Sequence, residues 1–491
     1  MKETLAIASL VALPLAAMAA PAPNACSGLT QLKLPKAHIQ SATPVAAGDK
    51  LSLWSGGLPQ SMPKAFCRVR GLATPVPGSA IGFEVWLPET SAWNGKYLQA
   101  GNGGTAGAIP LSSLLDGVLR GYATAATDSG HVWPDGLDYG WAALRPESVV
   151  DFGWRAVQRT SDAAQRIVHR GLGRAPKKSY FMGCSDGGRD AMMVAQRFPE
   201  AFDGIVAGAP AQAWLDIMIG GALLQRELAP PTGVLTVAKL PALQGAVRAA
   251  CAAGGKVIVD PQQCRFDPSV VQCTGAETDA CLTERQVSAV RIAYTGLTDA
   301  TGRRLPGLAM GAEAEPGNWD FWLLRAPTNP IDGSPRVPGA PPPTSINESF
   351  FRHLVREDPA FKLADLRDAD TLQARQLWAG TLDALDPDLS KLKRRGTKLL
   401  HYHGWTDAPI PPRMSLDYFA SVQQKMGDTR DFHRLFMVPG MNHCGGGEGP
   451  WQVDWLNVLE RWVEGGQAPS ELTARHPGTG ATQVLRHEAR R

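Results

Sequence analysis

The sequence predicts an α/β fold that is divided by one long helical insertion, and three observations predict it. Short apolar runs, typical of buried strands, recur in the first and last parts of the 491-residue chain. Polar, glycine-rich motifs follow several of these runs directly, which is where an open α/β sheet carries its chemistry. Residues 211–390, between the two parts, lack the strand pattern. We therefore expect one large core made of two sequence segments.

The expected strands are short runs of apolar residues. They lie at Ile81–Leu87, Tyr97–Gln99, Ala123–Thr127, Ser179–Met182, Gly204–Ala207, Lys398–Tyr402 and Arg434–Val438. Helices are expected at Glu147–Arg170, between two of these strands, and at Arg189–Phe198. Because parallel strands need crossover connections, strands that alternate with helices favour a largely parallel sheet.

The segment 211–390 is expected to form a lid domain. It contains helical patterns, four of the eight cysteines and a proline-rich connection at Pro335–Pro343. A long stretch without strands inside a compact domain is usually functional. The expected division of the chain is residues 1–19 as a signal peptide, 20–210 and 391–491 as the two parts of the core, and 211–390 as the lid.

The N-terminus has the pattern of an export signal. Lys2 precedes a run of apolar and small residues from Leu5 to Ala20, and Ala17-Met18-Ala19 within it fits a signal-peptidase site. Pro14 interrupts the run, which is also short for a membrane span. We expect a secreted or periplasmic protein with no membrane partner. In such oxidising surroundings the eight cysteines are expected to form disulfides.

The charge of the chain argues against one class of partner. With 49 Lys and Arg against 46 Asp and Glu, the formal net charge is +3. The basic cluster Lys391–Arg395 is best explained as the solvated end of a helix. A nucleic-acid-binding protein usually carries a basic stripe, so no nucleic-acid partner is expected.

Gly183-Cys184-Ser185-Asp186-Gly187 matches the G-x-S-x-G pattern of a nucleophile elbow. It lies between an apolar run and a helical stretch, which is the setting that this strand-to-helix turn needs. The glycines leave room for a strained backbone that presents the serine oxygen. A bare match is equally typical of an ordinary glycine-rich turn, so the interpretation depends on partners for Ser185.

An aspartate and a histidine that come much later in the chain complete a candidate triad. Asp407 follows the apolar run that ends near Tyr402, and His443 follows the run that ends at Val438. Each by itself also fits an ordinary turn. The order Ser, Asp, His is that of the α/β-hydrolase fold, whereas chymotrypsin and subtilisin have other orders. We therefore expect an α/β-hydrolase fold with a large inserted lid domain, in which Ser185 is the nucleophile.

Both Ser185 and His443 have a cysteine beside them, Cys184 and Cys444. If the serine and histidine side chains are hydrogen-bonded, these cysteines come within the Cα separation of about 4.4–6.8 Å that a disulfide needs. A Cys184–Cys444 disulfide is therefore expected, and it points to the same site as the triad.

An acyl-transfer site also needs hydrogen-bond donors for the oxyanion. The loop Gly101–Gly107 follows an expected strand, and the backbone at Gly103 and Gly104 is open to a developing negative charge. The other expected donor is the N–H of Asp186, the residue after the nucleophile. The alternatives for the loop are a phosphate-binding loop and a plain turn. No Gly-Lys-Ser/Thr follows and the spacing is not G-x-G-x-x-G, which argues against nucleotide binding.

Together these motifs resemble the tannase and feruloyl esterase family, which includes the enzyme that hydrolyses mono(2-hydroxyethyl) terephthalate. The resemblance runs from about Trp54 to Arg461. It rests on Gly101–Gly107, Tyr122–His131, Gly183–Arg189, Tyr402–Asp407 and Pro439–Cys444.

The resemblance implies roles for individual residues. Ser185 would be the nucleophile, His443 the general base and acid, and Asp407 the residue that orients the imidazole. His403 would line the substrate pocket. The implied disulfides are Cys184–Cys444, Cys26–Cys67, Cys251–Cys264 and Cys273–Cys281. The last three rest mainly on the resemblance, because the sequence alone leaves other pairings open.

One departure from the family concerns calcium. Relatives commonly carry a calcium loop between the cysteines that correspond to Cys251 and Cys264. Here that segment has one carboxylate, Asp260, and a lysine, Lys256. Calcium takes about six to eight oxygen ligands that include carboxylates. We therefore expect no calcium at this site, and the predicted chemistry requires no metal or organic cofactor.

The predicted function is that of a secreted serine carboxylic-ester hydrolase. The expected substrate is an aromatic acyl ester of the feruloyl, galloyl or terephthalate monoester type, either small or attached to a plant polysaccharide or polyphenol. The lid offers rings and cations for such a substrate: Trp319, Trp322, Phe350, Phe351, Arg325 and Arg352. Packing within the lid explains each ring equally well, and exposure is the usual state of an arginine.

Two alternatives use the same scaffold. A serine peptidase would have the same triad and differ only in its pocket. A non-catalytic binding protein usually lacks a triad member, and this chain has all three.

Overall fold

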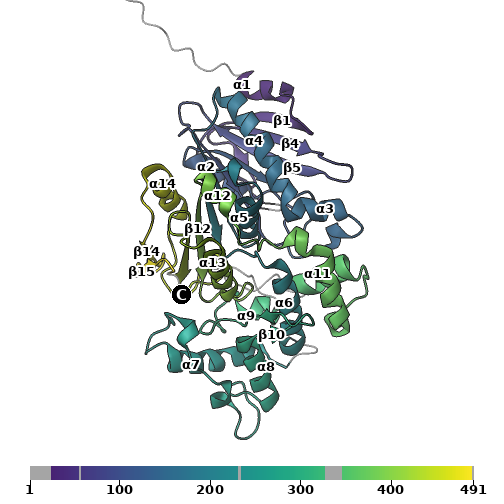
Figure 1. Ribbon diagram of the computed structural model, residues 1–491, viewed down its shortest axis with the longest axis vertical. Coiled ribbons are helices and arrows are strands. Elements are labelled where there is room, and N and C mark those ends of the chain that lie inside the picture. The colour runs from purple at the N-terminus through teal and green to yellow at the C-terminus, as the bar shows by residue number, and fades with distance from the viewer. Residues whose placement is uncertain (1–23, 55–56, 230–233, 327–344, 489–491) are drawn as a thin grey trace, which may run out of the picture.

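The computed structural model describes residues 24–54, 57–229, 234–326 and 345–488 (Figure 1). The expected signal peptide and the proline-rich connection lie outside these residues. A nine-stranded sheet in the order β1-β4-β5-β7-β6-β8-β9-β12-β13 forms the centre. Its strands are β1 Ala37–Val45, β4 Phe66–Ala73, β5 Ile81–Pro88, β6 Lys96–Ala100, β7 Ala123–Thr127, β8 Lys178–Cys184, β9 Gly204–Gly208, β12 Lys398–Gly404 and β13 His433–Val438.

All the strands expected from apolar runs are present, which confirms that part of the prediction. The neighbours from β7 to β13 in sheet order pair in parallel, whereas β1, β4, β5 and β7 pair antiparallel. β1 and β4 were not expected. β1 is an edge strand that contains Pro44, and two of its nine residues are buried, so it shows no apolar run.

Helices cover both faces of the sheet, so successive residues of a strand face different cores. In β8, Phe181 packs in the cluster that contains α4 and α5, and Tyr180 packs in the cluster that contains α14. Strands buried on both faces appear as continuous apolar runs, which is why the sequence located them. The covering helices are α2 Leu111–Leu119, α4 Ala156–Leu172, α5 Asp186–Arg197, α13 Arg413–Met426 and α14 Trp455–Gly465.

The expected helix at Glu147–Arg170 is present in three pieces. α3 spans Pro146–Val150, a π-helical turn spans Asp151–Arg155, and α4 continues from Ala156. The π-helical turn contacts α5 and contributes to the site described below. Among the residues that the structure describes, no helix is long and apolar enough to cross a bilayer.

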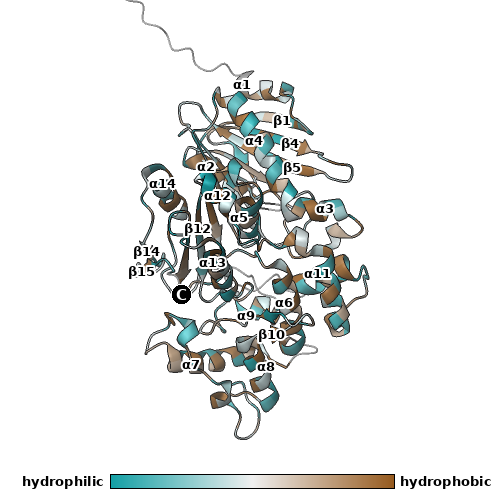
Figure 2. Cartoon of the chain, in the orientation of Figure 1, coloured by the Kyte–Doolittle hydropathy of each residue, from teal (hydrophilic) through white to brown (hydrophobic). Residues whose placement is uncertain are grey.

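Residues 209–397, between β9 and β12, form the insert, and its described part is largely helical. Its elements are α6 Trp214–Leu228, α7 Leu240–Cys251, α8 Glu284–Thr295, α9 Trp319–Trp322, α10 Ile346–Phe350, α11 Asp368–Leu382 and α12 Ser390–Arg395, with the short strands β10 Leu297–Thr298 and β11 Arg304–Leu305. Its helices α7 and α8 lie at the end of the molecule away from β1, whereas α12 lies beside α5, and the helices of the insert carry both hydrophobic and hydrophilic residues (Figures 1 and 2).

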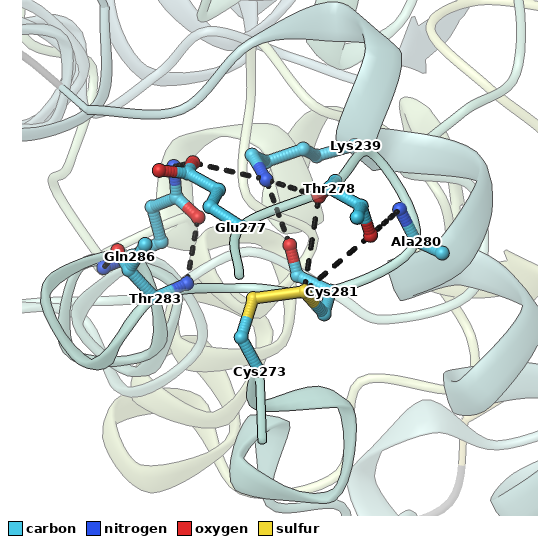
Figure 3. Close-up of a disulfide and its surroundings, with 8 residues drawn as sticks. All are labelled: Lys239, Cys273, Glu277, Thr278, Ala280, Cys281, Thr283 and Gln286. Atoms are coloured by element: carbon cyan, nitrogen blue, oxygen red, sulfur yellow. Dashed lines mark hydrogen bonds and ion pairs between the residues drawn. A yellow bond between two sulfur atoms is a disulfide. The ribbon is translucent and has the colours of Figure 1, made fainter. Parts of the chain in front are cut away.

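A disulfide and a buried lysine together fix one loop of the insert (Figure 3). The disulfide joins Cys273 to Cys281. Nζ of Lys239 donates to the carbonyl oxygens of Thr278 and Cys281 at 2.6 and 2.8 Å, and lies 3.1 Å from the carboxylate of Glu277. These oxygens replace the water that the buried ammonium loses. The loop is therefore held by a covalent bond and by a cation.

Candidate active site

Ser185 lies in a sharp turn between β8 and α5. Its backbone angles, φ 65° and ψ −124°, are rare for a non-glycine residue and cost about 1–3 kcal/mol. Both flanking glycines are needed: a Cβ on Gly183 would lie 2.3 Å from O of Gly187, and a Cβ on Gly187 would lie 2.6 Å from O of Asn102. The turn therefore has the geometry of a nucleophile elbow at the carboxyl end of β8.

Ser185, His443 and Asp407 are hydrogen-bonded in series. The hydroxyl of Ser185 donates to Nε2 of His443 at 2.8 Å, and Nδ1–H of His443 donates to Oδ2 of Asp407 at 2.7 Å. The three residues follow the carboxyl ends of β8, β13 and β12, which belong to the parallel part of the sheet. A nucleophile, a base and an orienting carboxylate need this arrangement.

Asp407 is buried, and its carboxylate has several partners. Oδ1 accepts from the N–H of Ile410 at 2.9 Å, and Nε2 of His403 lies 3.3 Å from Oδ2. Burial alone would raise the pKa of Asp407, but the imidazoles of His443 and His403 lower it to about 2. The carboxylate is therefore ionised at neutral pH and favours a proton on the neighbouring imidazole.

His403 is not where the resemblance implies. Its ring is fully buried in β12, with Nε2–H donating to O of Ile410 at 3.0 Å and Nδ1 accepting from the hydroxyl of Ser415 at 2.6 Å. It is not among the described residues that line the pocket. Because both ring nitrogens are engaged inside the core, His403 contacts Asp407 instead of the pocket.

The glycine-rich loop passes beside Ser185, and its two candidate donors differ. The N–H of Gly103 donates to Oδ1 of Asn102 at 2.9 Å, whereas Gly104 borders the same pocket as Ser185. Gly104 has φ 58°, and a Cβ there would lie 2.1 Å from O of Gly136, so only glycine fits. Asp186, the other expected donor, is the first residue of α5, where a backbone N–H has no partner within the helix.

His131 supports this loop from behind. Its Nε2–H donates to O of Thr105 at 2.9 Å, and the hydroxyl of Thr105 donates to O of Asp138 at 3.0 Å. The imidazole stacks on Trp141 with ring centroids 3.6 Å apart, and burial lowers the pKa of His131 to about 4. The ring is therefore neutral with its proton on Nε2. The sequence motif Tyr122–His131 did not reveal this contact.

A buried arginine, also missed from the sequence, holds the side chain of Asp186. Nε of Arg189 donates to Oδ1 of Asp186 at 2.7 Å. The other two guanidinium nitrogens donate to the carbonyls of Phe152 and Gly153 in the π-helical turn, at 2.9 and 2.7 Å. The spacing of three residues between Asp186 and Arg189 on one helix is a signal that could have predicted the pair.

An apolar pocket opens at Ser185 and His443. Its walls come from α6, α9, α10 and the segment that follows Asp407. Apolar side chains dominate the lining, as in most pockets for small organic molecules. They include Leu137, Ile217, Leu224, Trp322, Ile346 and Ile410.

Of the lid residues expected to contact a substrate, Trp322 lines this pocket. Its ring packs edge-on against the imidazole of His443, with centroids 5.9 Å apart. Trp319 is instead buried in an apolar cluster of the insert, and Phe350 is buried in a cluster where the insert packs against Tyr139 of the first core segment. Arg325 is half-buried and is not among the described lining residues. The expectation for these three residues is corrected accordingly.

The disulfide Cys184–Cys444 joins the elbow to the loop that carries His443. Its Cα atoms are 6.0 Å apart, across a sequence separation of 260. The remaining cysteines pair as the resemblance implies. These pairs are Cys26–Cys67, Cys251–Cys264 and Cys273–Cys281.

The segment between Cys251 and Cys264 uses its single carboxylate locally. Asp260 accepts from the N–H of Gln262 and from Nε2 of Gln263, both at 3.0 Å. Within the described ranges, no group of three or more His, Cys, Asp or Glu side chains is arranged to hold a metal ion.

Known proteins resemble this chain over most of its length. The family model described as "Tannase and feruloyl esterase" matches residues 67–490. An uncharacterized esterase of Xanthomonas campestris pv. campestris is 38% identical over 500 residues, which cover 93% of this chain and 84% of that protein. The mono(2-hydroxyethyl) terephthalate hydrolase of Piscinibacter sakaiensis is 32% identical over 458 residues, which cover 80% of this chain and 74% of that protein.

Solved structures extend the similarity to three dimensions. The crystal structure of feruloyl esterase B from Aspergillus oryzae matches with a TM-score of 0.84 at 25% identity, and the match covers 94% of this chain and 95% of that one. The similarity therefore includes the insert as well as the sheet, and the fold is of the α/β-hydrolase type.

Proposed function

The chain belongs to the tannase and feruloyl esterase family and is a carboxylic ester hydrolase, and on this premise we propose that it cleaves esters of aromatic acids through Ser185, His443 and Asp407. One observation carries the proposal: the hydrogen-bonded series of these side chains ends in a serine hydroxyl at an apolar pocket. A serine beside a general base, with a third group that orients the base, is the arrangement that acyl transfer by a serine nucleophile needs.

The proposed mechanism follows from the positions of the protons. As Oγ of Ser185 attacks the ester carbonyl, Nε2 of His443 takes its proton and then delivers it to the departing alkoxide, which leaves as an alcohol. Water attacks the resulting acyl-enzyme with His443 again as base, and the acid and the free serine are released. The ionised Asp407 favours the imidazolium that forms in each step.

The proposed oxyanion donors are the N–H groups of Asp186 and Gly104. The first lies at the N-terminus of α5, where the helix dipole favours negative charge. The second belongs to a residue that borders the pocket, whereas the N–H of Gly103 already donates to Asn102. The N–H of Gly103 would have to give up its hydrogen bond to Asn102 before it could donate to the oxyanion.

The proposed acyl group is aromatic. Apolar walls and the indole of Trp322 beside His443 support a flat ring in the pocket. The names of the relatives, a feruloyl esterase and a hydrolase of a terephthalate monoester, point to esters of the same class. We further propose that the ester is either small or attached to a plant polysaccharide or polyphenol.

We also propose that residues 1–19 are an export signal and that residues 211–390 act as a lid. The four disulfides fit a secreted or periplasmic location. The contribution of α6, α9 and α10 to the pocket supports the lid.

An assay of the purified protein with methyl ferulate, methyl gallate and mono(2-hydroxyethyl) terephthalate tests the proposal. We expect hydrolysis of at least one of these esters by the wild type and none by Ser185→Ala. The amides that correspond to these esters are assayed as well, because a serine peptidase would cleave them. Cleavage of the amides without cleavage of the esters, or no cleavage of either, would contradict the proposed function.

A further inference from the structure

The insert contacts the loops of the proposed triad through a buried polar link. Asn442, which precedes His443, donates from Nδ2 to Oε2 of Glu315 at 2.9 Å. Glu315 belongs to the insert, and 7% of its surface is exposed. The residue beside the proposed base is therefore held by a carboxylate from outside the α/β core.

The same amide also reaches the loop of Asp407. Oδ1 of Asn442 accepts from the hydroxyl of Thr406 at 2.8 Å, and Thr406 directly precedes Asp407. The side chain of Asn442 thus joins the neighbours of two triad residues to each other and to the insert.

Two further residues of the insert, Asn318 and Arg248, make the link rigid. Nδ2 of Asn318 donates to the carbonyl of Thr406 at 3.0 Å and lies 3.3 Å from Oδ1 of Asn442. The guanidinium of Arg248, on α7, donates to Oε1 of Glu315 at 2.7 Å. Hydrogen bonds of buried groups are strong, and the loss of one leaves an unsatisfied partner.

We propose that Glu315 is a positioning residue: through Asn442 and Thr406 it fixes His443 relative to Asp407, so that the insert supports the chemical step as well as substrate binding. The inference rests on the proposed function, because that function assigns His443 and Asp407 their roles. None of Glu315, Asn442 and Thr406 is among the described residues that line the pocket. Loosening the link should therefore change kcat and leave KM nearly constant.

A charge exchange between the partners tests the link. Asn442→Asp places a second carboxylate against that of Glu315. When Glu315→Gln is combined with Asn442→Asp, the new amide at position 315 can donate to the new carboxylate at position 442, so a hydrogen bond between the two positions is restored. With an ester that the wild type hydrolyses, we expect Asn442→Asp to lower kcat on the order of a hundredfold, as a displacement of about 1 Å at reacting groups does. The kcat of the double variant should be at least about tenfold higher than that of Asn442→Asp.

The matched control is Glu313→Gln. Glu313 is a fully buried carboxylate of the same insert, but its partners, the hydroxyl of Tyr294 and the N–H of Gly311, both belong to the insert. We expect its kcat to stay within about twofold of the wild type. All values of kcat are taken from the plateau of the pH profile, so that a shifted titration of His443 does not imitate a loss of position.

Several outcomes would overturn the inference. They are a near-native kcat for Asn442→Asp, a double variant no faster than Asn442→Asp, or a change in KM alone. If circular dichroism shows that Asn442→Asp is unfolded, Thr406→Val replaces it, since it removes one donor and keeps the size. We expect kcat to fall about tenfold there, and an unchanged kcat would also overturn the inference. Ser185→Ala is assayed alongside. Activity of Ser185→Ala would refute the proposed function. If Ser185→Ala is inactive but the Asn442 or Thr406 variant keeps the kcat of the wild type, only this inference is refuted.

Discussion

Cys184 and Cys444 are joined by a disulfide that links the residue before Ser185 to the residue after His443. The disulfide thus connects the sequence neighbours of Ser185 and His443, the two residues between which the proposed mechanism moves a proton. A loop of this length is worth roughly 5 kcal/mol in the chain-entropy model. Its position suggests a second use, which is to hold the His443 loop against the elbow.

The first prediction is that this disulfide serves catalysis before stability. In Cys184→Ala/Cys444→Ala the His443 loop is free to shift, and we expect kcat to fall on the order of a hundredfold. The rate is measured at a temperature where circular dichroism shows the variant fully folded. A near-native kcat there would mean that the disulfide only stabilises the fold.

The second prediction concerns pH. The folded-state pKa of Asp407 is lowered to about 2, so its ionised form stabilises the fold above its unfolded pKa of about 3.9. This stability is lost as pH falls through the window from about 4 to about 2. The difference in free energy of unfolding between the wild type and Asp407→Asn, measured in urea, should shrink by roughly 2 kcal/mol between pH 5 and pH 2.5. A difference that is independent of pH would contradict the charge assignment.

The third prediction separates two aromatic residues of the insert. Trp322→Ala removes a ring from the pocket, so we expect KM for an aromatic ester to rise about tenfold with little change in melting temperature. Phe350→Ala instead leaves a cavity in an apolar cluster, at a cost of about 3–5 kcal/mol of stability, while KM stays constant. Steady-state kinetics and urea unfolding of both variants check this. The reverse pattern would place Phe350 at the substrate.

The parallel strands and the three residues of the proposed triad could be located from the sequence for a physical reason. Strands buried on both faces appear as apolar runs, and the polar residues after β8, β12 and β13 meet at one edge of the sheet. The edge strand β1 buries two of its nine residues and carries a proline, so its apolar pattern is weak.

Contacts between distant segments could not be found in this way. Trp319 and Trp322 have the same residue type and lie on one short helix, yet only the packing of that helix decides which of them borders the pocket. Arg189, which donates to the carbonyls of Phe152 and Gly153, and Glu315, which accepts from Asn442, likewise depend on partners that are brought together by the fold. The resemblance named His403 but implied the wrong surroundings for it.

The fourth prediction is that chelation leaves the protein unchanged. Asp260 is engaged by Gln262 and Gln263, and Nζ of Lys256 lies 3.3 Å from the carboxylate of Glu448. We therefore expect EDTA to alter neither the melting temperature nor kcat. If EDTA lowers the melting temperature by several degrees and calcium alone restores it, the chain does bind calcium, at this loop or elsewhere.

The central claim is that Ser185 is the nucleophile, activated by His443. The most direct measurement is intact-mass spectrometry with peptide mapping after reaction with a fluorophosphonate. We predict a single adduct on Ser185 in the wild type, much slower labelling in His443→Ala, and no adduct in Ser185→Ala, whose kcat should fall on the order of a millionfold. An adduct on another residue, or a Ser185→Ala protein that keeps more than about a tenth of the ester-hydrolysing activity, would contradict the account.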